Sequence, residues 1–294
     1  MSQSPKNHNA RLLGYPDDAR MLIINADDFG MCHAINEAIL RSIKEGIVQS
    51  TSLMPVCPWA LNGIQILKEN PDIPFAVHLT TISEAHNYRW SPLSPKDKVP
   101  SLVDENGYCP AYAHMMEFMA NVNLNELEME FRAQIEFVLK AGLKPTHLDW
   151  HCLKGEHLEP IFNLMFRLAQ EYGLALRIPR EPMTGQVQSQ GLPANDHPLL
   201  DSYDLPVEGK LAHYARMLRD LPTGLSEWAV HPGYGTSELQ AIEPKSWQVR
   251  QSDFEFVISP EAREIIRQEG IILLNYKPLQ HLWQNQTVTS STVS

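Results

Sequence analysis

The sequence predicts an α/β protein built on a (β/α) barrel. Short apolar runs rich in β-branched residues alternate with longer helical patterns over nearly the whole chain. Such alternation is typical of a parallel sheet with helices outside it. Seven strand candidates within 294 residues fit a barrel, complete or incomplete, better than an open sheet with a separate domain.

The strand candidates are short and stand between polar residues, Gly and Pro. They are residues 21–25, 47–53, 75–79, 146–150, 174–178, 227–231 and 271–275. Apolar stripes with helical spacing lie at residues 35–43, 124–139 and 158–172, and a further helix is expected over 261–269. Local signals mark the helix ends: Gly46 and Gly173 as stops, Asn123 with Glu126 as a capping-box start, and Ser259 as an N-cap.

The chain is expected to form one domain. We expect a flexible segment over residues 1–18, a single barrel over 19–283 and a disordered tail over 284–294. Two stretches, residues 81–110 and 182–206, are rich in Pro, Ser, Asn and Asp and too long to be simple connections. Loops of that length on a barrel are usually functional or disordered.

Composition excludes several classes of function. The net charge is −11 and Lys and Arg are not clustered, which argues against nucleic acid as a partner. We expect no membrane association, because no apolar stretch approaches the length of a membrane span. The polar N-terminus lacks a signal peptide, so a cytoplasmic location is expected. The four scattered cysteines predict reduced, mostly buried thiols.

Polar side chains that suit catalysis stand at the ends of four strand candidates. Asp27 and Asp28 follow the first, and the others are His78, the pair Asp149 and His151, and His231. In a parallel barrel these ends converge on one face. Adjacent carboxylates disfavour double ionisation unless a cation binds one of them. A carboxylate with two imidazoles forms a catalytic metal site that activates water.

Each of these residues also has a structural interpretation. Asp27 or Asp28 alone could cap the following helix, and His78 alone could be a core histidine bonded to a carbonyl group. His147, two residues before Asp149, is interpreted as structural. The coincidence of four strand ends that each present an acid or an imidazole favours a functional site over packing alone.

The motifs together resemble the YdjC-like family of carbohydrate deacetylases, over residues 21–276. They are Asn25-Ala26-Asp27-Asp28-Phe29-Gly30, residues 46–54, His78-Leu79-Thr80, residues 145–151, residues 175–181 and Val230-His231-Pro232-Gly233-Tyr234. The resemblance implies a distorted, TIM-like (β/α) barrel that removes an acetyl group from N-acetylated sugars, such as chitooligosaccharides, with a divalent metal ion.

Carried over by motif, the resemblance gives Asp28, His78 and His151 as metal ligands and Asp27 as the general base. Ligand softness suits zinc or cobalt, whereas the family is also found with magnesium. One departure is Trp150, a bulky indole where many members have a small serine. It leaves the ligand His151 intact and puts the substrate in question.

The remaining site residues are assigned from their positions at strand ends and on loops. By its motif, the resemblance makes His231 the residue expected to protonate the leaving amine, and Asp149 and Arg177 are expected to support the site. The side chains expected to contact a small-molecule or oligosaccharide substrate are those of Arg180, Trp150, Tyr234 and Trp90. We expect either Arg177 or Arg180 to hold Asp27 in its ionised form or to bind the substrate. Of these two arginines, we favour Arg180.

Two other classes of function keep the same residues. One is a metal-dependent phosphoesterase or another amidohydrolase, which is weaker because the chain lacks a phosphate-binding glycine loop. The other is a non-catalytic sugar-binding barrel. The sequence does not fix the oligomeric state, for which a homodimer is the default expectation.

Overall fold

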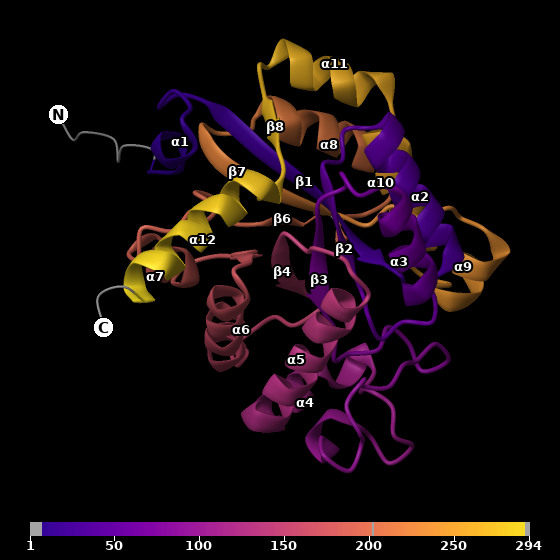
Figure 1. Cartoon of the computed structure of the whole chain (residues 1–294). Coiled ribbons are helices and arrows are strands. Elements are labelled where there is room, and N and C mark those ends of the chain that lie inside the picture. Colours follow the sequence, from indigo (N-terminus) through magenta and orange to yellow (C-terminus); the bar gives the residue numbers. More distant parts are fainter. Residues whose placement is uncertain (1–7, 202, 292–294) are drawn as a thin grey trace.

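Parallel strands form one curled sheet at the centre of the computed structural model, which describes residues 8–201 and 203–291 (Figure 1). The strands of the described residues are β1 (Arg20–Phe29), β2 (Ser50–Leu53), β3 (Phe75–Leu79), β4 (His147–Trp150), β5 (Ala175–Leu176), β6 (Leu200–Asp201), β7 (Gly224–Val230) and β8 (Ile272–Leu274). Their order is β5-β4-β3-β2-β1-β7-β6, and β8 pairs with β1. Within the described part of the chain no ladder joins β5 to β6, so the sheet is a half-barrel. The prediction of a distorted, incomplete barrel is confirmed.

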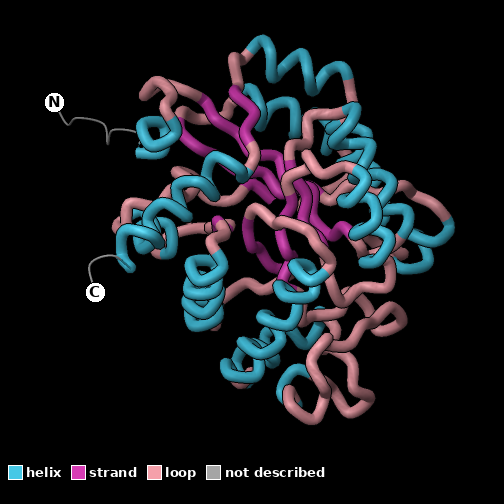
Figure 2. The backbone as a smooth tube through the Cα atoms, in the orientation of Figure 1, coloured by secondary structure: helices cyan, strands magenta, loops and turns pink. Residues whose placement is uncertain are grey.

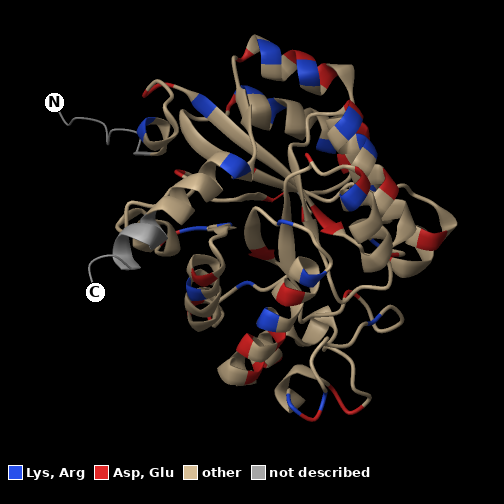
Figure 3. Ribbon diagram, viewed as in Figure 1, with Lys and Arg blue, Asp and Glu red and all other residues tan. Residues whose placement is uncertain are grey.

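Helices cover the outside of this sheet (Figure 2). They are α1 (His8–Leu13), α2 (His33–Glu45), α3 (Ala60–Glu69), α4 (Met115–Asn121), α5 (Leu124–Lys140), α6 (Leu158–Tyr172), α7 (Met183–Gln188), α8 (Lys210–Arg219), α9 (Ser237–Ile242), α10 (Trp247–Val257), α11 (Pro260–Gln268) and α12 (Tyr276–Ser291), with 3-10 turns η1 (Pro100–Leu102) and η2 (Tyr112–His114). On exposed helices such as α2 and α11, positive and negative positions lie close together (Figure 3). No helix in the described ranges combines the length and apolarity that crossing a membrane requires.

The predicted helix ends are confirmed with two changes of reason. Glu126 does not complete a capping box, because its carboxylate accepts from the backbone N–H of Ser101 and the Asn123 N–H donates to the Ser101 hydroxyl. The Asn123 side chain accepts from the backbone N–H of Asn125, at 2.9 Å, and Ser259 caps α11 in the same way. Gly173 adopts a left-handed φ of 64° after α6. Gly46 follows α2 with φ −115°, so conformation does not require glycine there. Space does, because a Cβ would lie 2.5 Å from the carbonyl oxygens of Ser42 and Val257.

The sequence missed one strand and misjudged some element lengths. β6 lies within the long loop predicted over 182–206, where a two-residue strand gives no periodic signal. The loop over 81–110 is mostly irregular, apart from η1 and two isolated bridges. Of the predicted flexible segments, residues 1–7 and 292–294 lie outside the described residues, and α12 continues to Ser291.

The core that positions the site is built around β1. From Met21 to Phe29 every residue of this strand is buried, as expected for a strand with neighbours on both edges. The four cysteines are free thiols, three of them buried and Cys152 partly exposed, which confirms the prediction from their spacing. Because β1 is a central strand of the sheet, the side chains at its carboxyl end lie near the carboxyl ends of the neighbouring strands.

Candidate active site

A bulge in β1 brings both carboxylates of the Asp27-Asp28 pair to the same cavity. Successive side chains of a regular strand face opposite sides of the sheet. Here the pairing with β2 slips between Ala26 and Phe29, which align with Thr51 and Leu53. The additional residue gives Asp28 a left-handed φ of 73°, a conformation that aspartate adopts more readily than most residues. Asp27 and Asp28 consequently both line the cavity.

Three potential metal ligands meet around Asp28. Its Oδ1 lies 3.4 Å from His78 Nε2 and 3.1 Å from His151 Nδ1, and all three side chains are buried. Their donor atoms lie within 4.8 Å of one another. One carboxylate and two imidazoles are the donors of many catalytic divalent-metal sites, so these residues fit the ion that the sequence predicts.

Asp149 orients the first of these imidazoles. Its Oδ1 accepts from His78 Nδ1 at 2.7 Å, which turns Nε2 toward Asp28. The Ser52 hydroxyl donates to the other oxygen of Asp149. Burial lowers the pKa of His78, but Asp149 outweighs it and the pKa rises to about 9. His147 lies outside this group and stacks on Tyr276, as its structural interpretation expects.

Asp27 is bound mainly by arginine, although its carboxylate also lies near His78 and Asp149 in a further group of potential metal donors. Arg177 donates to its two oxygens at 2.6 and 2.8 Å, and the Asn25 amide donates to one of them at 2.7 Å. Arg177 also contacts Asp149 at 3.2 Å and Glu227 at 2.9 Å. Burial raises the pKa of Asp27, but Arg177 outweighs it and holds the pKa below its usual value. The arginine beside Asp27 is thus Arg177, whereas Arg180 is exposed at the cavity mouth.

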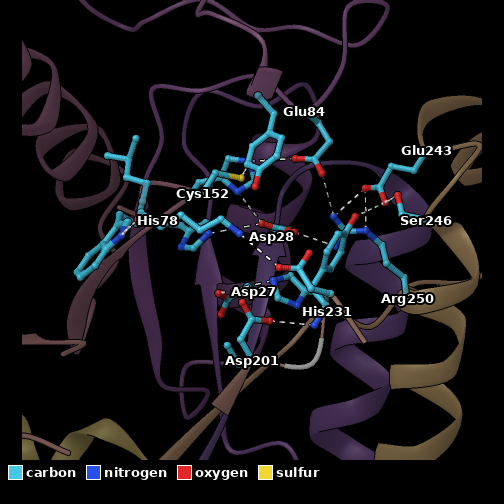
Figure 4. Close-up of a pocket in the computed structure, with 18 of the residues that line it drawn as sticks. Asp27, Asp28, His78, Glu84, Cys152, Asp201, His231, Glu243, Ser246 and Arg250 are labelled. Atoms are coloured by element: carbon cyan, nitrogen blue, oxygen red, sulfur yellow. Dashed lines mark hydrogen bonds and ion pairs between the residues drawn. The ribbon is translucent and has the colours of Figure 1, made fainter. Parts of the chain in front are cut away.

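A second buried arginine, missed by the sequence analysis, contacts Asp28 (Figure 4). Arg250, on α10, lies 2.8 Å from Asp28 Oδ2 and 2.7 Å from Glu243. Its guanidinium stands over the ring of Tyr203, 5.5 Å from the centroid. Burial raises the pKa of Asp28, but Arg250 and the two imidazoles hold it well below its usual range. A single arginine inside a helix offers no local sequence signal for such a contact.

The loop after β3 contributes Glu84, also missed as an individual residue. Its Oε2 lies 3.0 Å from His151 Nε2, and its side chain is 15% exposed. It belongs to residues 81–110, which the sequence analysis marked as a functional or disordered loop. Loop composition therefore indicated the segment, but nothing singled out the residue.

His231 faces Asp27 from the end of β7. Its Nε2 lies 4.0 Å from Asp27 Oδ2, and its ring contacts Tyr203 at a centroid distance of 4.9 Å. The backbone N–H of His231 donates to Asp253 at 2.8 Å, which fixes the start of the following loop. Asp27 and His231 therefore share one cavity of about 930 Å³ with the three metal-ligand candidates.

The four residues expected to contact substrate do not gather in one place. Arg180 and Trp150 line the cavity, and the Trp150 indole N–H donates to Leu153 at 2.9 Å. Tyr234 is not among the lining residues, and its ring packs on Phe254. Trp90 is 3% exposed and packs edge-on against the His151 ring, and it does not line the cavity.

Fold and site together define a class: α/β half-barrel proteins with a cluster of carboxylate and imidazole groups, which could hold a metal ion, at the carboxyl ends of the strands. The model of the YdjC-like protein family matches residues 21–268. The chain belongs to the YdjC-like family.

Named relatives agree with this assignment. A carbohydrate deacetylase of Enterococcus faecalis is 32% identical, with 88% of this chain and 98% of the relative covered. A chitooligosaccharide deacetylase of Yersinia enterocolitica is 29% identical, with 87% and 98% covered. A crystal structure of an Enterococcus faecalis protein, named as a candidate for cellobiose-phosphate cleavage, superposes with a TM-score of 0.74 at 30% identity, covering 89% of this chain and 99% of that one.

Proposed function

We propose that this protein hydrolyses the acetamide bond of an N-acetylated carbohydrate of the chitooligosaccharide type. The observation that carries the proposal is the separation of two carboxylates with different partners in one cavity. Asp28 lies among imidazoles that suit a metal ion, while Asp27 is held by Arg177 and remains available as a base. The names of the relatives supply the substrate class.

Asp28, His78 and His151 would hold the divalent ion. Such an ion lowers the pKa of a bound water and polarises a carbonyl group. Zinc fits the two nitrogen donors, and magnesium is the alternative for an enzyme that binds its ion weakly. Asp149 would fix the tautomer of His78, so that Nε2 is free to bind.

Asp27 would accept the proton of the attacking water. Its lowered pKa keeps it ionised throughout the neutral range, which a base requires. The bidentate contact from Arg177 also fixes the orientation of the carboxylate. A carboxylate of lowered pKa is a weak base, so the site depends on a water that is more acidic than bulk water.

His231 would donate a proton to the leaving amine. It lines the same cavity as Asp27, and its ring nitrogens can carry a proton to the amine. Tyr203 packs against its ring and would restrict its orientation. The two residues that exchange protons thus come from different strand ends, β1 and β7.

The sugar would enter the cavity through its mouth and bind inside it. Its volume of about 930 Å³ lies near the upper end of ordinary ligand sites and leaves room for more than one sugar ring. Trp150 and Arg180 line it and would contact the substrate. We further propose that residues 19–283 form a single catalytic domain that works in the cytoplasm as a homodimer.

Acetate release tests the proposal. Metal-free protein, reloaded with magnesium or zinc, is incubated with N-acetylglucosamine oligomers, with and without a chelator. We expect acetate only with metal. Asp27→Asn should reduce turnover by about 10²–10⁴-fold and retain metal binding. Asp17→Asn, an exposed control in an ion pair with Arg11, should retain turnover.

The same assay, repeated with phosphorylated disaccharides and phosphate esters as substrates, separates the alternatives. The name of the Enterococcus structure suggests phosphorylated disaccharides as a second substrate set. Release of free sugar phosphate without acetate would favour phosphorylated-disaccharide cleavage, and release of inorganic phosphate would favour a phosphoesterase. Binding of oligomers with no product from any substrate would favour a sugar-binding barrel. Each of these three results would contradict the deacetylase proposal.

A further inference from the structure

A second group of metal-binding donors adjoins the first and shares one of its residues. Glu84 Oε2 lies 3.0 Å from His151 Nε2, and Cys152 Sγ lies 3.1 Å from the same nitrogen. The three donor atoms lie within 4.8 Å of one another. All three residues line the cavity, and Figure 4 shows Glu84 and Cys152 there.

The backbone holds Cys152 in a position from which its sulfur faces the imidazole. Its φ is 64°, in the left-handed region that residues with a Cβ rarely adopt. Of the described non-glycine residues, the only other one with positive φ is Asp28, in the first donor group. Glu84 approaches from the loop after β3, so the three donors come from two distant segments of the chain.

The donors of this second group favour other ions than those of the first. A thiolate, an imidazole and a carboxylate suit zinc and cadmium, whereas magnesium binds oxygen ligands and disfavours sulfur. The first group, Asp28, His78 and His151, contains no sulfur. The two groups therefore differ in selectivity although they lie next to each other.

His151 cannot serve both groups while its imidazole is neutral. Its Nδ1 faces Asp28 at 3.1 Å, and its Nε2 faces Glu84 and Cys152. A neutral imidazole carries one N–H and one lone pair. An ion bound at Nε2 leaves the proton on Nδ1. The Nδ1–H group then donates to Asp28, and Nδ1 can no longer bind the ion of the first group.

We propose that Glu84, His151 and Cys152 form a second site for a thiophilic divalent ion, and that occupation of this site withdraws His151 from the first donor group. Binding releases to solvent the thiol proton of Cys152 and the proton on His151 Nε2, while the proton on Nδ1 stays in place. Thiophilic ions therefore compete with the ion of the first group. The inhibitory consequence rests on the proposed deacetylase function; the binding itself does not.

Cadmium titration of the metal-free protein tests the binding. A thiolate bound to Cd²⁺ gives an ultraviolet charge-transfer absorption, which we expect to saturate at one ion per chain. Cys152→Ser should abolish this absorption, and Glu84→Gln should weaken cadmium binding by about tenfold or more, the cost of a lost partner in many metal sites. Cys109→Ala, which removes a buried thiol elsewhere, should retain the absorption. Thermal unfolding of Cys152→Ser verifies that the variant is folded.

Competition is measured on the same protein. Cadmium should weaken magnesium binding in calorimetry, and Cys152→Ser should relieve this effect. In the acetate assay, the cadmium concentration that halves turnover should rise by about tenfold or more in Cys152→Ser.

Several outcomes would overturn the inference. They are a charge-transfer absorption that persists in Cys152→Ser, its absence in the wild-type protein, or undiminished magnesium binding with cadmium bound. If no acetate is released under any condition, the proposed function fails, and the cadmium titration still decides whether the second site exists.

Discussion

Replacing Arg177 with glutamine should destabilise the protein strongly, because the Arg177 side chain is the positive partner of three buried carboxyl groups. Its guanidinium contacts Asp27, Asp149 and Glu227, all at 3.2 Å or less, and its side chain is 4% exposed. The glutamine side chain carries no charge. The substitution therefore leaves three carboxyl groups in the protein interior without their cation.

The expected magnitude follows from that burial. Breaking a buried ion pair by removing one partner costs about 3–5 kcal/mol. A typical domain has a free energy of unfolding of about 5–15 kcal/mol, so the loss is a large share of it. The matched control is Arg167→Gln, since Arg167 also binds a carboxylate with two nitrogens, at 2.6 and 2.9 Å, but its side chain is 52% exposed. An exposed pair contributes about 0.2–1 kcal/mol.

Urea denaturation of the metal-free protein measures both variants, and pH provides an internal check. Arg177 lowers the pKa of Asp27 and Asp149 against the effect of burial. A lowered folded-state pKa contributes stability above the unfolded value, about 4, and this contribution is lost as the pH falls further. The deficit of Arg177→Gln should therefore be complete at pH 7 and smaller at pH 3. A deficit below about 1 kcal/mol at pH 7, or one that does not change with pH, would refute this reasoning.

Three further predictions concern the pH dependence, the metal and the backbone of the site. The pKa of His78 is raised to about 9 from an ordinary 6.5, which contributes about 3 kcal/mol to the free energy of unfolding below pH 6.5. This contribution is lost as the pH rises through 9. In urea denaturation of the metal-free protein, the difference in free energy of unfolding between wild type and His78→Asn should therefore become smaller over that pH range. Asp28→Asn should weaken metal binding in calorimetry by about tenfold or more, and unchanged affinity would contradict its role as a ligand. Gly30→Ala should lower the unfolding temperature more than Gly142→Ala. Both glycines have positive φ, but of the two only Gly30 has backbone atoms 3.2 Å from the place a Cβ would occupy. Equal losses in unfolding temperature would show that this contact is unimportant.

The sequence predicted most of the sheet because strand signals are local. A continuous apolar run such as residues 75–79 bounded by polar residues and Pro identified β3 with its bounds intact. β6 escaped because two residues form no pattern, and its strand conformation depends on pairing with β7. Helix caps were equally readable, since Asn123 bonds a backbone N–H only two residues away.

The candidate site was only partly readable from the sequence, for the same reason. Asp27, Asp28, His78, His151 and His231 were found because each stands at the end of a strand, and parallel strand ends converge. Arg250 was missed because its contact with Asp28 joins a helix to a strand end more than 200 positions earlier in the chain. No spacing rule links residues so far apart.

What the sequence determined by itself is therefore the alternation of strands and helices, the family and the candidate ligands Asp28, His78 and His151. The tertiary structure decided how those donors divide. The bulge in β1 turned adjacent carboxylates into the same cavity, packing placed Arg177 and not Arg180 on Asp27, and the left-handed backbone at Cys152 brought a thiol beside His151. Sequence patterns record which residues are near one another along the chain, whereas partner choice in a buried cluster depends on charges and atoms that only folding brings together.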